Sequence, residues 1–314
     1  MTSPVYVGVD ISKSELVVAT AATVLCTLPN DRDGHRDLVK RLRKMEGATV
    51  VVESTGCYGR ALATAIATSG ITIAVVQPGL VRHFAKSRGI LAKTDAIDAK
   101  VIAQFGESNK PRPWSLPAAE TTRLRALVDR RDQIVELRKQ EQNHLETCAD
   151  STIATSIRKS IARLAKLEKQ LDAQLAAHLQ EHEPLRRLSE ALQGESGVGL
   201  QTAANLIAYM PELGSLNRQK VAAMVGFAPY NKDSGKQEGK RSIQGGRRRL
   251  RRALYMAAIS ASRFNPWIST IYQRLIQRGK PKKVALVACG RKLAIRLNSI
   301  AAGVLSTAPV AQPG

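Results

Sequence analysis

The sequence predicts an α/β unit at the amino terminus, followed by regions built from helices alone. Three observations lead to this fold class. Short apolar runs of strand length alternate with helical spacing over residues 1–110, three prolines cluster in 109–117, and helical spacing prevails afterwards. A chain of 314 residues is also too long for one small core. We therefore expect three segments, at 1–110, 111–184 and 185–314.

In the first segment, β-branched and apolar runs predict strands that are joined by short turns and helices. The turn at Ser12-Lys13-Ser14 suggests that the first two strands form a hairpin. Thr94 is placed to cap the last helix of this segment. The expected strands are 5–11, 15–21, 24–28, 48–52 and 71–76, and the expected helices are 33–45, 58–68 and 94–105.

The second segment contains neither proline nor glycine between residues 118 and 183. Helical spacing of its apolar residues predicts two long helices, which form either a coiled-coil hairpin or a plain bundle. The apolar positions that carry this spacing are Ile153, Ile157, Ile161, Leu164, Leu171, Leu175 and Leu179. The third segment is predicted to be helical at 200–209, 217–225, 247–262, 267–277 and 282–304.

The charge of the chain is strongly positive: 48 Lys and Arg stand against 26 Asp and Glu, which gives a net charge of +22 and a pI of about 10.3. Such charge repels itself unless a polyanion neutralises it, so DNA or RNA is the expected partner. An anionic membrane surface is the competing partner. No apolar run is long enough to span a bilayer, and no secretory signal is visible, so we expect no membrane association.

Cysteines and aromatic residues exclude other classes of protein. The four cysteines form no C-x-x-C pair, so neither a zinc site nor a disulfide framework is expected, and a reducing cytoplasm fits. Aromatic residues make up 4% of the chain, which argues against the stacking platforms of single-strand-binding proteins. Among the five histidines, His178 and His182 have the i, i+4 spacing of one helix face, and we expect surface positions rather than a metal site.

Four carboxylates of the first segment carry its candidate chemistry. Asp10 and Glu53 stand near the ends of predicted strands, and Asp95 and Asp98 share one face of a predicted helix. If the strands are neighbours in one sheet, the four acids converge, and their mutual repulsion then requires a cation. Hard oxygen ligands suit Mg²⁺ or Mn²⁺. Two such ions polarise a phosphodiester and stabilise its attacking and leaving oxygens.

Each acid also has an ordinary structural interpretation. An aspartate at a strand end is usually a turn or cap residue, and Asp95 after Thr94 favours the helix dipole without further function. Glu53 is harder to explain in this way, because it follows Val-Val-Val in a strand that we expect to be buried. The combination in a basic protein favours a functional set.

The third segment contains the densest basic cluster. Between Lys232 and Arg252 lie nine Lys and Arg and only two acids, so binding to phosphates should weaken steeply with salt. A solvated basic loop is the ordinary alternative. Upstream, Gly197-Val-Gly199 resembles a helix-hairpin-helix turn, which presents amide groups to a phosphate, or is simply a helix start. The candidate nucleic-acid ligands are Lys232, Lys236, Lys240, Arg241, Arg247, Arg248, Arg249, Arg251, Arg252, Gly197 and Gly199.

The phrases VGVDISK, VVVESTGCYGR and AKTDAIDAKVIAQF, together with residues 226–258, resemble the DEDD transposases of insertion sequences, which are bridge-RNA-guided recombinases. The resemblance implies an RNase H-like, RuvC-type first domain with a metal on Asp10, Glu53, Asp95 and Asp98. It also implies that Ser234, in Asp233-Ser-Gly, is the nucleophile. Taken alone, a serine in such a turn is usually a turn residue.

The same resemblance implies donor and target DNA, a structured guide RNA, and a homo-oligomer, dimer or tetramer, in the bacterial cytoplasm, associated with the nucleoid when bound to DNA. Two other functions remain open. A RuvC-like structure-specific nuclease would need the carboxylates but not Ser234, and a scaffold on a decayed fold would need neither.

Overall fold

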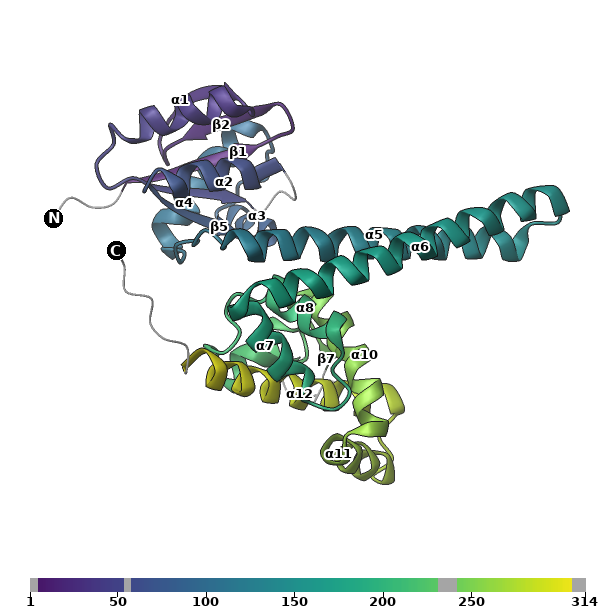
Figure 1. The fold of residues 1–314 in the computed structure, drawn as a ribbon. Helices are drawn as coiled ribbons and strands as arrows, with labels where there is room; N and C mark the ends of the chain where they lie inside the picture. Colours follow the sequence, from purple (N-terminus) through teal and green to yellow (C-terminus); the bar gives the residue numbers. More distant parts are fainter. Residues whose placement is uncertain (1–4, 54–57, 231–241, 307–314) are drawn as a thin grey trace. The chain divides into compact units, whose positions relative to one another are not determined.

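The computed structural model describes residues 5–53, 58–230 and 242–306 (Figure 1). The chain divides into two compact units, Met1–Pro117 and Ala118–Gly314, and each unit is described by itself. No helix within the described ranges is both long enough and apolar enough to cross a membrane.

A mixed sheet of five strands forms the centre of the first unit, in the order β3–β2–β1–β4–β5 (Figure 1). β1 pairs antiparallel with β2 and β2 antiparallel with β3, whereas β4 joins β1, and β5 joins β4, in parallel. This sheet and the helical region after it confirm the predicted RNase H-like class. The bounds are Tyr6–Ile11 (β1), Glu15–Ala19 (β2), Val24–Pro29 (β3), Thr49–Glu53 (β4) and Thr72–Val76 (β5).

Helices cover both faces of this sheet. α1 (Arg32–Leu42) and α2 (Tyr58–Thr68) pack on the face that carries Val7, Val9, Val50 and Val52. α3 (Pro78–Ser87) and α4 (Asp95–Asn109) pack on the opposite face, over Tyr6, Val51 and Val76. α3 was absent from the sequence prediction. It starts with Pro78 in its first turn, where the missing N–H breaks no helical hydrogen bond.

α4 lies unusually close to the sheet, because two glycines leave it room. A Cβ on Gly8 of β1 would lie 2.2 Å from the Ala99 carbonyl oxygen and 2.5 Å from the Ala103 nitrogen. A Cβ on Gly106 of α4 would lie 2.7 Å from the Tyr6 ring. Glycine at both contacts therefore fixes the spacing and direction of α4 across β1.

The second unit starts with the two long helices expected from the sequence, α5 (Ala119–Thr147) and α6 (Ser151–Glu181), which run side by side as a hairpin (Figure 1). Neither proline nor glycine makes the turn. Asp150 caps α6 instead, since its carboxylate accepts from the Thr152 and Ile153 amides at 2.8 and 2.9 Å. Charges in the seam are paired: Arg131 contacts Glu168 and Asp172 across the hairpin.

Six further helices complete the described part of this unit around one core. The core takes in Leu124 and Val128 from the start of α5 and Leu175 and Leu179 from the end of α6, so the open end of the hairpin is built into it. α7 extends the sequence prediction, which had no helix between residues 184 and 199. The helices are α7 (Glu183–Gln193), α8 (Leu200–Tyr209), α9 (Arg218–Met224), α10 (Arg248–Phe264), α11 (Pro266–Gln277) and α12 (Lys282–Ser306).

Two residue pairs, β6 (Pro229–Tyr230) and β7 (Ser242–Ile243), form a small antiparallel ladder in the second unit. Tyr230 and Ser242, which pair in this ladder, flank residues 231–241, and these lie outside the described residues. Asp233, Ser234 and the basic residues Lys232, Lys236, Lys240 and Arg241 belong to that segment.

Candidate active site

Two acids stand side by side at one edge of the sheet of the first unit. The parallel register of β1 and β4 runs to Val9 opposite Val52, so Asp10 and Glu53 are the next residues on the two strands. Asp10 shares the face of Gly8, and Glu53 shares the face of Val51, because side chains alternate along a strand. Both carboxylates therefore lie on the face that α4 covers.

α4 brings the other two acids to the same edge. Ala99 packs on Gly8, and Asp98 and Asp95 lie one position and about one turn before it, next to Asp10. The start of the helix is fixed by Thr94, whose hydroxyl accepts from the Ile97 amide at 3.2 Å. Asp95 is exposed, and Asp98 is half-buried. The predicted function of Thr94 as a cap is confirmed.

Electrostatics show that these acids lie close together. Burial, together with the charges of Asp95 and Asp98, raises the pKa of Asp10. Burial, together with the charges of Asp10 and Asp98, raises the pKa of Glu53. Lys93 opposes both shifts. Proximity and repulsion of this kind are typical of a site that is built to hold a cation.

A hollow of about 340 Å³ opens beside the acids, between the start of α3 and the start of α4. Glu53 and Asp98 line it on the acidic side, and Lys93 and Arg82 contribute cations. The hollow therefore combines groups that attract a metal ion with groups that attract a phosphate.

The donor set fits a divalent cation. Asp10 and Glu53 are partly desolvated carboxylates, hard oxygen donors, and each is destabilised by its acidic neighbours. Within the described residues, no three of the four acids bring their ligand oxygens within 4.8 Å of one another. Mutual repulsion favours this spacing, and Lys93 offsets it only in part, since the pKa values of Asp10 and Glu53 remain raised.

The arginines of the basic segment divide into two groups. Arg248 and Arg252 are exposed. Arg247 instead binds Glu212 through two hydrogen bonds of 2.6 and 2.7 Å, and Arg251 donates to the Gly245 carbonyl. Arg248 and Arg252 are therefore the better placed of these residues to meet a phosphate.

Arg249 lies in a half-buried ion network that joins α10 to α5. It pairs with Asp129 and with Asp132, and its guanidinium lies over the Tyr209 ring, 4.2 Å from the centroid. Burial would raise the pKa of Asp129, but hydrogen bonds from Arg249 and Tyr209 outweigh it and lower that pKa. Burial and the bond to Asp129 raise the pKa of Tyr209 to about 12. The geometry gives Arg249 a structural function.

The two glycines of the Gly-Val-Gly turn differ in their surroundings. Gly197 has a φ of 95°, and a Cβ there would lie 2.6 Å from the Ala261 backbone, so this glycine allows close packing on α10. Gly199 is the N-cap of α8, and nothing lies within 4 Å of a Cβ built on it. Of the two, only Gly199 has open space in front of it.

Comparison with known proteins covers both units. Residues 7–154 match a family model described as "Transposase", and residues 189–273 match one described as "Transposase IS116/IS110/IS902 family". Together these matches cover most of the chain. The chain belongs to the IS110 family of DEDD transposases. As a family member it is an enzyme that acts on DNA, and the family implies a divalent metal.

Relatives of this transposase include the "Pilin gene-inverting protein" of Moraxella bovis, which is 28% identical over 307 residues, 93% of this chain and 94% of that protein. The protein of the same name from Moraxella lacunata matches to the same extent. An insertion element IS110 uncharacterized 43.6 kDa protein of Streptomyces coelicolor is 31% identical over 142 residues, 45% of this chain and 34% of that protein.

Sequence reasoning missed three residues around the site of the transposase. Lys93 and Arg82 line the acidic hollow, and Gly8 sets the distance of α4. Lys93 had a visible signal, since it stands two residues before Asp95. Arg82 had none, because α3 was not predicted, and Gly8 required knowledge of the element that packs on it.

Proposed function

We propose that this transposase cuts and rejoins DNA strands at defined sites of a mobile element, with a covalent phosphoserine intermediate on Ser234. Mg²⁺, or alternatively Mn²⁺, is held by Asp10, Glu53, Asp95 and Asp98. The observation that carries the proposal is the gathering of four acids from β1, β4 and α4 at one edge of the sheet. The match to a pilin gene-inverting protein over almost the whole chain supports strand exchange rather than cleavage alone.

The chemistry proceeds in two exchanges at phosphorus. The Ser234 oxygen loses its proton and bonds to the scissile phosphorus, while the bond from phosphorus to the leaving DNA oxygen breaks and that oxygen takes up a proton. A hydroxyl of the partner strand then displaces Ser234 in the same way, so that no external energy source is needed. A divalent metal supplies charge stabilisation to the phosphate oxygens when it is bound.

Further parts of the proposal concern partners. The exposed Arg248 and Arg252 and the amides at Gly199 contact backbone phosphates of DNA and of a structured guide RNA. We also propose that residues 111–184 assemble the protein into a homo-oligomer through a coiled coil. They lie between a RuvC-like catalytic domain at 1–110 and a C-terminal transposase domain at 185–314, which carries the serine nucleophile. The exposed apolar side chains Leu137 and Ile153 near the closed end of the hairpin support this assignment.

Replacement of Ser234 tests the covalent intermediate. In Ser234→Ala, we expect recombination of a reporter plasmid that carries the DNA flanking the gene to fall below detection, with DNA binding nearly unchanged. Denaturing gels of wild-type protein with ³²P-labelled DNA should show a covalent adduct that the variant lacks, and acid hydrolysis should release phosphoserine.

Two outcomes would contradict this intermediate. Phosphotyrosine in the hydrolysate would move the nucleophile to another residue. Undiminished cleavage by Ser234→Ala would instead favour a RuvC-like structure-specific nuclease, for which the carboxylates suffice. An Asp10→Asn variant that keeps every activity would instead favour a nucleic-acid-binding scaffold on a decayed RuvC-like fold, which needs no carboxylates.

The exposed arginines give a second prediction. We expect Arg248→Ala/Arg252→Ala to weaken binding to DNA of any sequence and to reduce the salt slope by roughly one to two counterions, because each phosphate contact releases about one ion. Filter binding at a series of salt concentrations measures this slope. Arg247→Ala is the matched control: it removes one positive charge from the same segment, but an arginine already paired with Glu212. An unchanged slope in the double variant would exclude this surface.

A further inference from the structure

We propose that His178, Glu181 and His182 form a second metal site, which binds a transition ion such as Zn²⁺ and is separate from the carboxylate set. Each residue offers one ligand atom, and the three atoms lie within 4.8 Å of one another. Across the described residues, this is the one group of three His, Cys, Asp or Glu that is gathered so closely. This site takes no part in the recombination chemistry, and the proposal does not depend on the proposed function.

The spacing of the three residues follows from the end of a helix. They occupy positions i, i+3 and i+4 in His-Leu-Gln-Glu-His of α6, so one face of its last turn carries all three. The two imidazole rings meet edge to face, with centroids 4.6 Å apart. Two imidazoles and one carboxylate form a set with which proteins bind Zn²⁺ with a position left for water.

A backbone contact determines which nitrogen of the neutral His178 ring carries the hydrogen. This side chain is buried, and its Nε2 lies 2.8 Å from the Glu120 carbonyl oxygen. A carbonyl has no proton to donate, so Nε2 carries the hydrogen, and in the neutral ring Nδ1 keeps its lone pair. An imidazole that donates its other N–H to a carbonyl is the arrangement that orients metal-binding histidines. The sequence prediction of a surface position for His178 is wrong.

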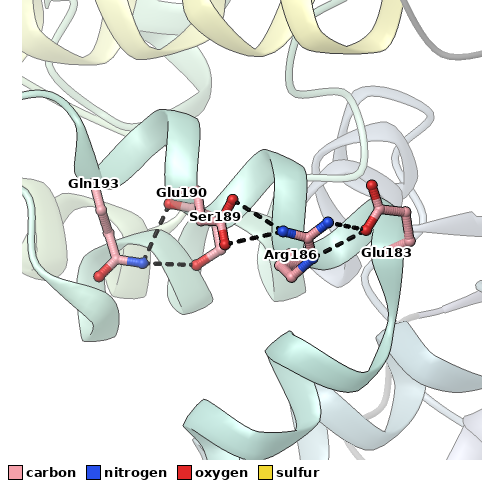
Figure 2. A network of polar contacts seen from close by, with 5 residues as sticks. All are labelled: Glu183, Arg186, Ser189, Glu190 and Gln193. Atoms are coloured by element: carbon pink, nitrogen blue, oxygen red, sulfur yellow. Dashed lines mark hydrogen bonds and ion pairs between the residues drawn. The ribbon is translucent and has the colours of Figure 1, made fainter.

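The neighbouring acid is already engaged, which leaves Glu181 as the carboxylate of the site. Glu183 binds Arg186, which also pairs with Glu190 3.4 Å away (Figure 2). Ser189 and Gln193 continue the same polar row along α7, with the Gln193 amide 2.9 Å from the Ser189 hydroxyl (Figure 2). Glu183 and Glu190 therefore neutralise Arg186, so that Arg186 needs no charge from Glu181. Glu181 is exposed and has no ion pair in the described part of the chain.

The position of the site suggests what a bound ion would do. His182 is both the C-cap of α6 and the N-cap of α7, and its backbone is extended. An ion bound by both His178 and His182 would fix the angle between α6 and α7, at the point where the long hairpin enters the helical core. Imidazole ligands also select Zn²⁺, Ni²⁺ or Cu²⁺ over Mg²⁺, so the two sites would be loaded by different ions.

Titration of the full-length protein with Zn²⁺ in excess Mg²⁺ tests the site. We expect one bound Zn²⁺ per chain by calorimetry, a higher midpoint of thermal unfolding, and, with Co²⁺ as a probe, visible absorption bands of a low-coordinate ion. His182→Ala should weaken Zn²⁺ binding by at least about tenfold and abolish the rise in the midpoint. His182 is chosen because it is less buried than His178, and His144→Ala, an exposed histidine of α5, is the control.

The outcomes separate this site from the carboxylates. Zn²⁺ binding that survives in His182→Ala but disappears in Asp10→Asn would place the ion at the sheet edge and overturn the proposal, as would wild-type protein that binds no Zn²⁺. Binding that is lost in His182→Ala and kept in Asp10→Asn supports it, whatever the recombination assays give.

Discussion

Asp10→Asn is expected to lower DNA strand cleavage by at least about 10³-fold, because the loss of a metal-bound carboxylate removes several kcal/mol of charge stabilisation from the transition state. The same change should stabilise the metal-free protein at neutral pH. Asp10 is half-buried next to Asp95 and Asp98, and an uncharged amide removes both the desolvation and the repulsion that raise the pKa of this carboxyl.

The pH dependence of this stability has a definite sign. A raised pKa means that the folded state holds the proton of Asp10 or Glu53 more tightly than the unfolded state does. The free energy of unfolding of the metal-free protein therefore falls as the pH rises from the ordinary carboxyl pKa through the raised one. Thermal unfolding at a series of pH values measures this, and Asp10→Asn should flatten the fall.

Mg²⁺ supplies the decisive comparison for Asp10. It should raise the unfolding midpoint of wild-type protein and leave that of Asp10→Asn nearly unchanged, since an ion stabilises only a fold that binds it. Glu46→Gln, in an exposed position of the first unit, is the control for a simple loss of negative charge. If Asp10→Asn cleaved DNA at the wild-type rate, Asp10 would not belong to the active site.

Gly8→Ala is expected to destabilise the first unit by about 2–3 kcal/mol, near the upper end of overpacking in a close-packed core. The added methyl group would lie 2.2 Å from a backbone oxygen of α4, which cannot turn away as a side chain can. α4 must therefore shift, and it carries Asp95 and Asp98 with it. A misplacement of about 1 Å costs about 10²-fold in rate, so cleavage should fall even where the protein remains folded.

Denaturant unfolding followed by circular dichroism measures the change, and cleavage is assayed at a temperature where the variant is folded. Gly79→Ala is the matched control, because nothing lies within 4 Å of a Cβ at that helical position. If Gly8→Ala were as stable and as active as Gly79→Ala, the close approach of α4 would not position the acids.

Local chemistry explains which elements the sequence predicted well. A short apolar run marked β1 and a valine run marked β4. Thr94 marked the start of α4, and the absence of proline and glycine marked the two long helices. α3 was missed because Pro78 and Gly79 look like a turn when their position in the first turn of a helix is unknown. α7 was missed because Pro184, also in a first turn, falls at the predicted boundary between the second and third segments.

The sequence predicted which acids form the candidate site, but not which of the nearby arginines are already paired with acids. Asp10 and Glu53 stand at the ends of strands, and neighbouring parallel strands bring such residues together. By contrast, Arg249 looked like a ligand for phosphate in a run of arginines. Only the fold, in which ion pairs join α10 to α5, places Asp129 and Asp132 in front of it. Pairing between distant segments decides which cations of a basic run are available to a ligand.

The long hairpin also has a mechanical consequence. α6 has 31 residues and therefore extends about 46 Å at about 1.5 Å per residue, while only its last turns are embedded in the core of the second unit. A stiff rod held at one end amplifies motion: a tilt of roughly 10° at its root displaces its tip by about 8 Å. A small repacking around Leu175 and Leu179 would thus displace the closed end of the hairpin, and any group bound there, by several times the local shift.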